Sequence, residues 1–201
     1  MIAVILFAIL FCAFYFIANQ IVSASNTSFD RYAYNLLKRL TSDTVTKIVI
    51  WITFFGSRRF IFPSYVLLAA YFLFFTRKKK FVFDIAVIGL LGNQLLTLMK
   101  YVFHRQRPLD PLIKNVTGYG FPSGHSFAAF TFFGLLIYII WQKKIKTVYK
   151  LILSVIFFLI ASSIAISRVY LHVHYATDVI GGFCLSMMWL LLSLWLLHKV
   201  K

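Results

Sequence analysis

Long apolar runs alternate with short polar segments along the whole chain. A helix that crosses a bilayer needs about 20 mostly apolar residues, so runs near this length predict membrane spans. Charged or turn-forming residues separate each run from the next. The pattern predicts six spans, at residues 2–22, 60–75, 81–99, 125–141, 151–166 and 178–197.

The stretch between the first two spans has a different pattern. Residues 23–46 are polar and of mixed charge, and their apolar members recur at helical spacing: Phe29, Tyr32, Leu36, Leu37 and Leu40. One apolar face on a charged helix is typical of a helix that lies in the membrane interface. The segment 48–55 is apolar but too short to cross, and residues 56–59 interrupt it, so the pattern leaves open whether it is embedded.

These elements together predict an all-α polytopic membrane protein, with six transmembrane helices and a short interfacial amphipathic helix after the first span. The chain has no internal repeat and no low-complexity linker. We therefore expect one membrane-embedded domain over residues 1–201.

Composition supports a membrane protein and adds a charge that needs explanation. Apolar residues make up 61% of the 201 positions, charged residues only 13%, and the mean hydropathy is +0.86, which excludes an ordinary water-soluble domain. The formal charge is +16, from 21 lysines and arginines against five acids. All five acids are aspartates, so mechanisms that need a glutamate base or a carboxylate-rich metal cage have few candidates. Cys12 and Cys184 lie in apolar runs, which argues against a disulfide framework.

The distribution of cations predicts the orientation. Ten lysines and arginines fall on the side that holds the two termini and eleven on the other side. The ten sit in very short loops next to span ends, where the positive-inside rule applies best. We therefore expect both termini in the cytoplasm of a cell-membrane protein, and the basic run 77–80 to contact anionic lipid rather than nucleic acid.

Three polar blocks fall on the opposite, extracytoplasmic face: residues 100–108, 121–126 and 167–178. Lys100, Arg107 and Arg168 are cations without a matching set of carboxylates, as expected for a site that binds a phosphoryl group. Ser123 and Gly124 open a span, where a capping hydroxyl and free backbone amides form an anion site. Residue chemistry alone thus predicts phosphate as the ligand.

The same blocks contain the groups that phosphate-ester hydrolysis requires. His174 and Asp178 are four residues apart, so the carboxylate can hold one imidazole nitrogen while the other attacks phosphorus. His125 can protonate the leaving alkoxide. Two-metal hydrolysis is disfavoured, because only Asp110 and Asp178 lie on this face.

This pattern resembles the type-2 phosphatidic acid phosphatase superfamily of membrane lipid phosphatases. The matching blocks are Lys, six residues, Arg-Pro; Pro-Ser-Gly-His; and Ser-Arg, five residues, His, three residues, Asp. The resemblance implies a metal-independent and cofactor-free enzyme. Its catalytic groups would be His174 as the nucleophile that forms a phosphohistidine, Asp178 as its orienting partner and His125 as general acid. The implied phosphate-binding residues are Lys100, Arg107, Ser123, Gly124 and Arg168.

Two positions depart from the family pattern, His172 where glycine is usual and Ala176 where proline is common. Both departures could alter the entrance to the pocket. The sequence assigns no role to His104 or Arg105, and the His172–His174 pair lacks a third metal ligand.

The short chain resembles the small bacterial, phosphatidylglycerophosphatase B-like members of this family, and these act on phosphatidylglycerophosphate, undecaprenyl pyrophosphate or phosphatidic acid. We expect conversion of phosphatidylglycerophosphate to phosphatidylglycerol first and undecaprenyl pyrophosphate hydrolysis second. The partners are then a phospholipid or isoprenoid lipid phosphate and the membrane, with no nucleic acid and no protein partner indicated. Two alternatives are an intramembrane serine hydrolase that uses Ser123, and an anion transporter or phospholipid-binding protein.

Overall fold

The computed structural model describes residues 2–23, 27–77, 79–114 and 116–199, and these residues form helices and loops without a strand. Parts of the predicted interfacial segment (24–26), of the basic run (Lys78) and of the tail (Val200 and Lys201) lie outside the described residues. Six helical stretches are long and apolar enough to cross a membrane, which confirms the six predicted spans.

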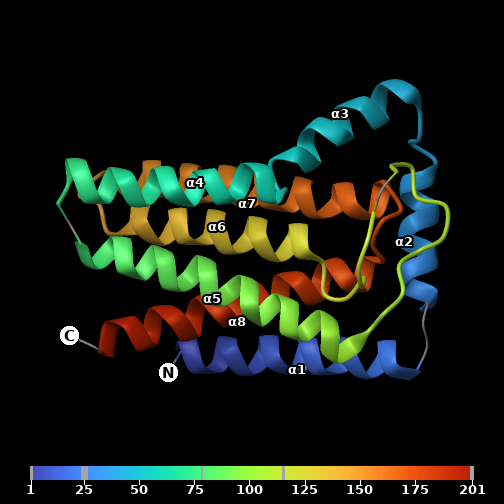
Figure 1. Cartoon of the computed structure of the whole chain (residues 1–201), viewed down its shortest axis with the longest axis horizontal. Helices are drawn as coiled ribbons and strands as arrows, with labels where there is room; N and C mark the ends of the chain where they lie inside the picture. The colour runs from blue at the N-terminus through green and yellow to red at the C-terminus, as the bar shows by residue number, and fades with distance from the viewer. Residues whose placement is uncertain (1, 24–26, 78, 115, 200–201) are drawn as a thin grey trace.

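The membrane-crossing helices run side by side, and α2 lies across one end of them (Figure 1). The start of α1 and the end of α8 lie together at the other end, as six crossings require. The helical elements, with the π-helical turn named η1, are α1 (Ile2–Ser23), α2 (Ser28–Lys38), α3 (Asp43–Phe54), α4 (Arg58–Ala70), η1 (Tyr71–Phe75), α5 (Lys79–Phe103), α6 (Gly124–Trp141), α7 (Thr147–Tyr170) and α8 (Ala176–Lys199).

Helix α6 lies at the centre of the bundle, against α7 on one side and α8 on the other. Phe130 and Phe133 of α6 are buried in one cluster with Ala161 and Ile164 of α7. Helix α8 approaches the first turn of α6 so closely that a Cβ atom on Gly182 would lie 2.8 Å from the carbonyl oxygen of Ser123. This close approach fixes the start of α6 beside the start of α8.

The spans are longer than the apolar runs that predicted them. Helix α5 continues through Lys100 to Phe103, and α7 continues through Arg168 to Tyr170. Polar residues therefore occupy the last turns of both helices instead of the loops after them. The second span is a 33-residue stretch made of α3, α4 and η1, and Phe55, Gly56 and Ser57 break it where the sequence predicted an interruption.

The helix α2 forms where an interfacial helix was expected, and it begins with a capping box. The Thr27 hydroxyl accepts from the Asp30 amide, and the Asp30 carboxylate accepts from the Thr27 amide. Phe29, Tyr32 and Leu36 are exposed, whereas Asp30 is buried. Most of the apolar face of α2 therefore points away from the protein, although Leu37 packs against the cluster around Leu171, and the buried residue of the helix is an acid.

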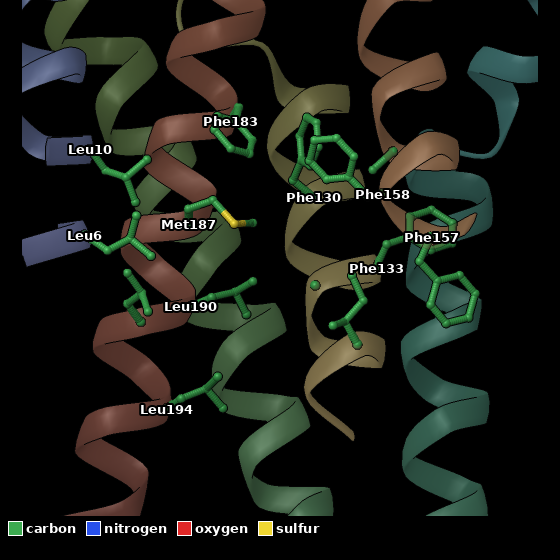
Figure 2. A pocket seen from close by; sticks show the side chains of 14 residues that line it. Leu6, Leu10, Phe130, Phe133, Phe157, Phe158, Phe183, Met187, Leu190 and Leu194 are labelled. Atoms are coloured by element: carbon green, nitrogen blue, oxygen red, sulfur yellow. The ribbon is translucent and has the colours of Figure 1, made fainter. Parts of the chain in front are cut away.

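A cavity of about 320 Å³ lies between α1, α6, α7 and α8, and Figure 2 shows the side chains that line it. Leu6 and Leu10 reach it from α1, Phe133 from α6 and Met187 from α8. Its lining holds no charged or hydrogen-bonding side chain. The phosphate chemistry predicted from the sequence therefore has no partner in this part of the bundle.

Candidate active site

The three polar blocks meet at the end of the bundle that α2 crosses, where the α5–α6 and α7–α8 connections also lie (Figure 1). A cavity of about 1530 Å³ opens there. Six of the eight residues predicted to form the site line it: Lys100, Arg107, Gly124, His125, Arg168 and His174. The fold thus brings together residues that are up to 74 positions apart.

His174 and Asp178 form a buried pair. His174 Nδ1 lies 3.1 Å from Asp178 Oδ2, and the two side chains are 2% and 0% exposed. Asp178 lies in the first turn of α8, but His174 lies in the turn before that helix. The contact that the four-residue spacing predicted is present, with one partner outside the helix.

The partners of His174 define its tautomer. Asp178 Oδ2 is an acceptor, so Nδ1 carries the proton, and Arg107 Nη1 donates to Nε2 over 3.1 Å. Burial, followed by the charges of Arg107, Lys100 and Arg168, holds the pKa of His174 well below its ordinary value. His174 is therefore neutral at physiological pH, with the lone pair of Nε2 on the cavity side.

Two of the three predicted phosphate-binding cations are held by backbone carbonyls. Lys100 Nζ donates to the Tyr119 carbonyl over 2.7 Å, and Arg107 donates to the carbonyls of Gly118, Val173 and Thr117. Neutral acceptors orient these cations without neutralising them. Their charge thus remains available to an anion in the cavity.

The third cation, Arg168, is 5% exposed. Its Nη1 donates to the Thr53 hydroxyl over 2.7 Å, which ties α7 to α3. Its Nε is buried and has no hydrogen-bond partner among the described residues. A buried, unpaired guanidinium N–H is costly, and an anion in the cavity would satisfy it.

The first turn of α6 presents Gly124 and His125 to the cavity. Ser123 precedes that turn, is fully buried and is not among the lining residues, and the Ser126 amide donates to its hydroxyl over 3.5 Å. The Ser123 amide donates to the Asp178 carbonyl over 2.9 Å, which joins α6 to α8. Ser123 is thus a helix cap here, and its contact with phosphate stays a prediction.

The sequence assigned no role to Arg105, which contacts the pair, or to Asp30, which contacts Arg105. Arg105 Nη1 donates to Asp178 Oδ1 over 2.5 Å, and Arg105 Nη2 donates to Asp30 Oδ2 over 2.9 Å. Asp30 comes from α2, so nothing in the local pattern indicated this contact. The capping box explains one partner of Asp30, but its burial became evident only from the fold.

The other unassigned histidines lie outside the cavity lining. The ring of His172 stacks on that of Tyr34, with centroids 3.6 Å apart. His104 is exposed, and its ring contacts Tyr119 edge-on at 4.6 Å. No group of three or more histidine, cysteine or acidic side chains converges as a metal site within the described ranges.

The cavity continues from the charged residues along α4 and α5. Its walls there are apolar and include Phe62 and Val66 of α4 and Ile85 and Leu90 of α5. Phe62, Val66 and Leu90 are also largely exposed. The cavity therefore extends from a cluster of cations to exposed apolar side chains of these two helices.

Comparison with known proteins agrees with this geometry. The family model of the PAP2 superfamily matches residues 79–201, which include all three polar blocks. Phosphatidylglycerophosphatase B of Bacillus subtilis is 27% identical over 194 residues, covering 96% of this chain and 95% of that protein. Dolichyldiphosphatase of Saccharomyces cerevisiae is 33% identical over 138 residues, covering 64% of this chain and 57% of that protein.

Two solved structures share the fold. A transmembrane PAP2-type phosphatidylglycerolphosphate phosphatase from Bacillus subtilis superposes with a TM-score of 0.86 at 27% identity, over 97% of each chain. LpxE of Aquifex aeolicus superposes with a TM-score of 0.67 at 23% identity, over 85% of this chain and 97% of that one, which supports the fold alone. The matched family, the whole-length relative and the cation-lined site together show that the chain belongs to the PAP2 superfamily and is a multi-pass membrane lipid phosphatase.

Proposed function

We propose that the protein hydrolyses lipid phosphate monoesters or diphosphates without a metal ion, through a phosphohistidine on His174, and that phosphatidylglycerophosphate is its first substrate. The observation that carries the proposal is one continuous cavity, whose lining includes both His174 and the exposed apolar side chains of α4 and α5. A phosphate at the charged end leaves its lipid chains in the apolar part of the cavity. The reacting end and the apolar end of such a substrate therefore both find a matching environment.

In the first step, His174 Nε2 attacks phosphorus and the bond to the lipid oxygen breaks. Lys100, Arg107 and Arg168 stabilise the charge on the phosphoryl oxygens, and the amides at the start of α6 assist them. His125 donates a proton to the leaving oxygen. The lipid alcohol departs, and the phosphoryl group remains on the imidazole.

In the second step, water attacks the phosphohistidine. His125, which has lost its proton, now accepts one from that water, and inorganic phosphate leaves. Asp178 holds Nδ1–H throughout, so the imidazolium character that develops on His174 is stabilised. The cycle restores every group and needs no cofactor.

Two further arginines favour a substrate that carries a second phosphate. Arg58 and Arg59 open α4, line the same cavity and have no acidic partner in the described part of the chain. Phosphatidylglycerophosphate has a phosphodiester besides its terminal phosphate, and undecaprenyl pyrophosphate has a second phosphate. Phosphatidic acid has neither, which ranks it third.

Histidine replacement tests the mechanism. In purified protein with chelator and no added metal, His174→Ala should abolish phosphate release and the acid-labile, alkali-stable labelling of the protein from ³²P-labelled lipid that a phosphohistidine gives. His104→Ala, at an exposed histidine outside the cavity, is the matched control and should retain near-normal turnover. Normal turnover in His174→Ala would overturn the phosphohistidine route, and a preference of the wild type for soluble sugar phosphates would overturn the lipid assignment.

A further inference from the structure

Asp30, Arg105 and Asp178 form a continuous buried chain of charges that ends at His174. The side chains of Arg105, Asp30 and Asp178 are 2%, 0% and 0% exposed. Both terminal nitrogens of Arg105 are used, one on each carboxylate. A planar guanidinium is the side chain that can bridge two carboxylates in this way, because its donors diverge in one rigid fork.

The remaining oxygens of the chain are also bonded. Asp178 Oδ2 accepts from His174 Nδ1 and from the Tyr175 amide over 3.0 Å, so both of its oxygens are held. Asp30 Oδ1 accepts from the Thr177 amide over 2.9 Å. The Thr177 hydroxyl lies between Asp30 Oδ1, at 2.9 Å, and Arg105 Nη1, at 2.7 Å. Few of these atoms can rotate without breaking a hydrogen bond.

A purely structural purpose explains this arrangement poorly. Burying three charges carries a large desolvation cost, and well-packed apolar residues in place of buried ion pairs are often at least as stabilising. Fastening α2 to the bundle therefore requires neither an arginine nor an acid at these positions. The chain does, however, contact the carboxylate that fixes the tautomer and orientation of the nucleophile.

We propose that Asp30 and Arg105 are positioning residues of the reaction, in which Asp30 of α2 orients the Arg105 guanidinium and that guanidinium holds Asp178 in the position that presents His174 Nε2 to phosphorus. The inference rests on the proposed function, because it needs His174 as the nucleophile. Neither residue touches the substrate. The interfacial helix α2 then forms part of the active site although it contributes nothing to the cavity lining.

The charges predict a signature that folding alone would not produce. His174 attacks only when Nε2 is unprotonated, so activity falls at acid pH as the pair takes up a proton. Loss of the Asp30 charge disfavours this protonation and moves the acid limb of kcat/KM to lower pH. Loss of the Arg105 charge favours protonation and moves it to higher pH. The other charged or titratable groups that face His174 are the same in the wild type and in the variants. They are Lys100 on α5, Arg107 on the α5–α6 loop, His125 on α6, Arg168 on α7, Tyr175 next to His174 in the chain, and Asp178 on α8.

The test compares Asp30→Asn, Arg105→Gln and the double variant with the wild type on the same lipid phosphate. The substrate's own titration is common to all four proteins, so differences between their profiles report the enzyme. We expect kcat to fall on the order of tenfold in Asp30→Asn with KM unchanged, by analogy with the loss of a residue that orients a metal ligand in metalloenzymes. The acid limbs should move in opposite directions in the single variants, and that of the double variant should lie between them. Arg105→Lys, which keeps the charge, should restore the wild-type acid limb while kcat stays low.

Asp43→Asn removes an exposed aspartate in the first turn of α3 and is the matched control. If Arg105→Gln does not fold, Asp30→Asn and the charge-balanced double variant carry the test. Acid limbs that superpose on the wild type, or a kcat for Asp30→Asn equal to that of Asp43→Asn, would overturn the inference. An active His174→Ala would instead overturn the proposed function, so the two failures are distinguishable.

Discussion

Arg58 and Arg59 allow the choice of substrate to be tested at single side chains. Replacing both with glutamine should lower kcat/KM by about tenfold for phosphatidylglycerophosphate and undecaprenyl pyrophosphate, the effect of one lost charge-assisted hydrogen bond. Phosphatidic acid, which lacks the second phosphate, should be affected much less. The measurement is phosphate release from the three lipids in mixed micelles.

The matched control removes two cations at the opposite end of the bundle, Lys144 and Lys146, which are exposed in the α6–α7 connection. Lys144→Gln with Lys146→Gln should leave the ranking of the three lipids unchanged. An equal decrease in kcat/KM for all three lipids in the arginine variant would show that Arg58 and Arg59 attract any anionic lipid and do not recognise a second phosphate.

At the scale of single residues, the sequence predicted the contacts between residues that are close together in the chain. The pairing of His174 with Asp178 follows from a separation of four residues, and the cations followed from the lack of acids around them. The role of Arg105 did not follow, because its second partner, Asp30, is 75 residues away. A contact between distant elements leaves no periodic trace in the sequence.

At the scale of elements, the close approach of α8 to α6 holds Asp178, and with it His174, beside the cavity. A substitution at Gly182 tests the importance of this approach. Gly182→Ala would place a methyl group 2.8 Å from the Ser123 carbonyl, so α8 must move away from α6. We expect a loss of about 1 to 3 kcal/mol in stability, the usual effect of overpacking, and lower kcat. Thermal unfolding in detergent and turnover measure the two effects.

The control is the same substitution in α5. A Cβ atom on Gly89 would lie 3.5 Å from the Tyr65 ring, an ordinary van der Waals distance. Gly89→Ala should therefore preserve or slightly raise stability, since alanine is the better helix former. Equal behaviour of Gly89→Ala and Gly182→Ala would show that the α6–α8 approach has room for a side chain.

Helix α2 shows how far an element can be predicted. Its position and amphipathic character followed from apolar spacing, but the pattern does not say which face meets protein and which meets lipid. In a soluble protein the apolar face would point inward. At a membrane surface lipid takes the apolar face, and the protein side can then hold a buried acid such as Asp30. The lengths of α5 and α7 were underestimated because the prediction ended each span at its last apolar residue. Lys100 and Arg168 are polar but still helical.

For the whole molecule, the distribution of cations predicts orientation, and accessibility in intact cells tests it. In a variant without Cys12 and Cys184, Leu109→Cys on the α5–α6 loop should react with a membrane-impermeant maleimide. Lys144→Cys, on the α6–α7 connection, should react only after the cells are permeabilised. Both positions are exposed.

The opposite labelling pattern would place the active site on the cytoplasmic side.

The number of spans could be predicted from the sequence because hydropathy measures it directly, and all six are confirmed. The cavity was not predictable, because its volume depends on how α4 and α5 diverge and not on either helix alone.

The apolar part of the cavity along α4 and α5 also determines what concentration means in the proposed reaction. In that proposal, a substrate whose chains never leave the bilayer arrives by diffusion in two dimensions, and Phe62 and Leu90 line the part of the cavity that receives its chains. The quantity that saturates the site is then the mole fraction of substrate among the membrane lipids, not its molarity in the assay. Adding inert lipid at a constant amount of substrate would lower the substrate's mole fraction and the reaction rate, although the volume of the sample stays the same.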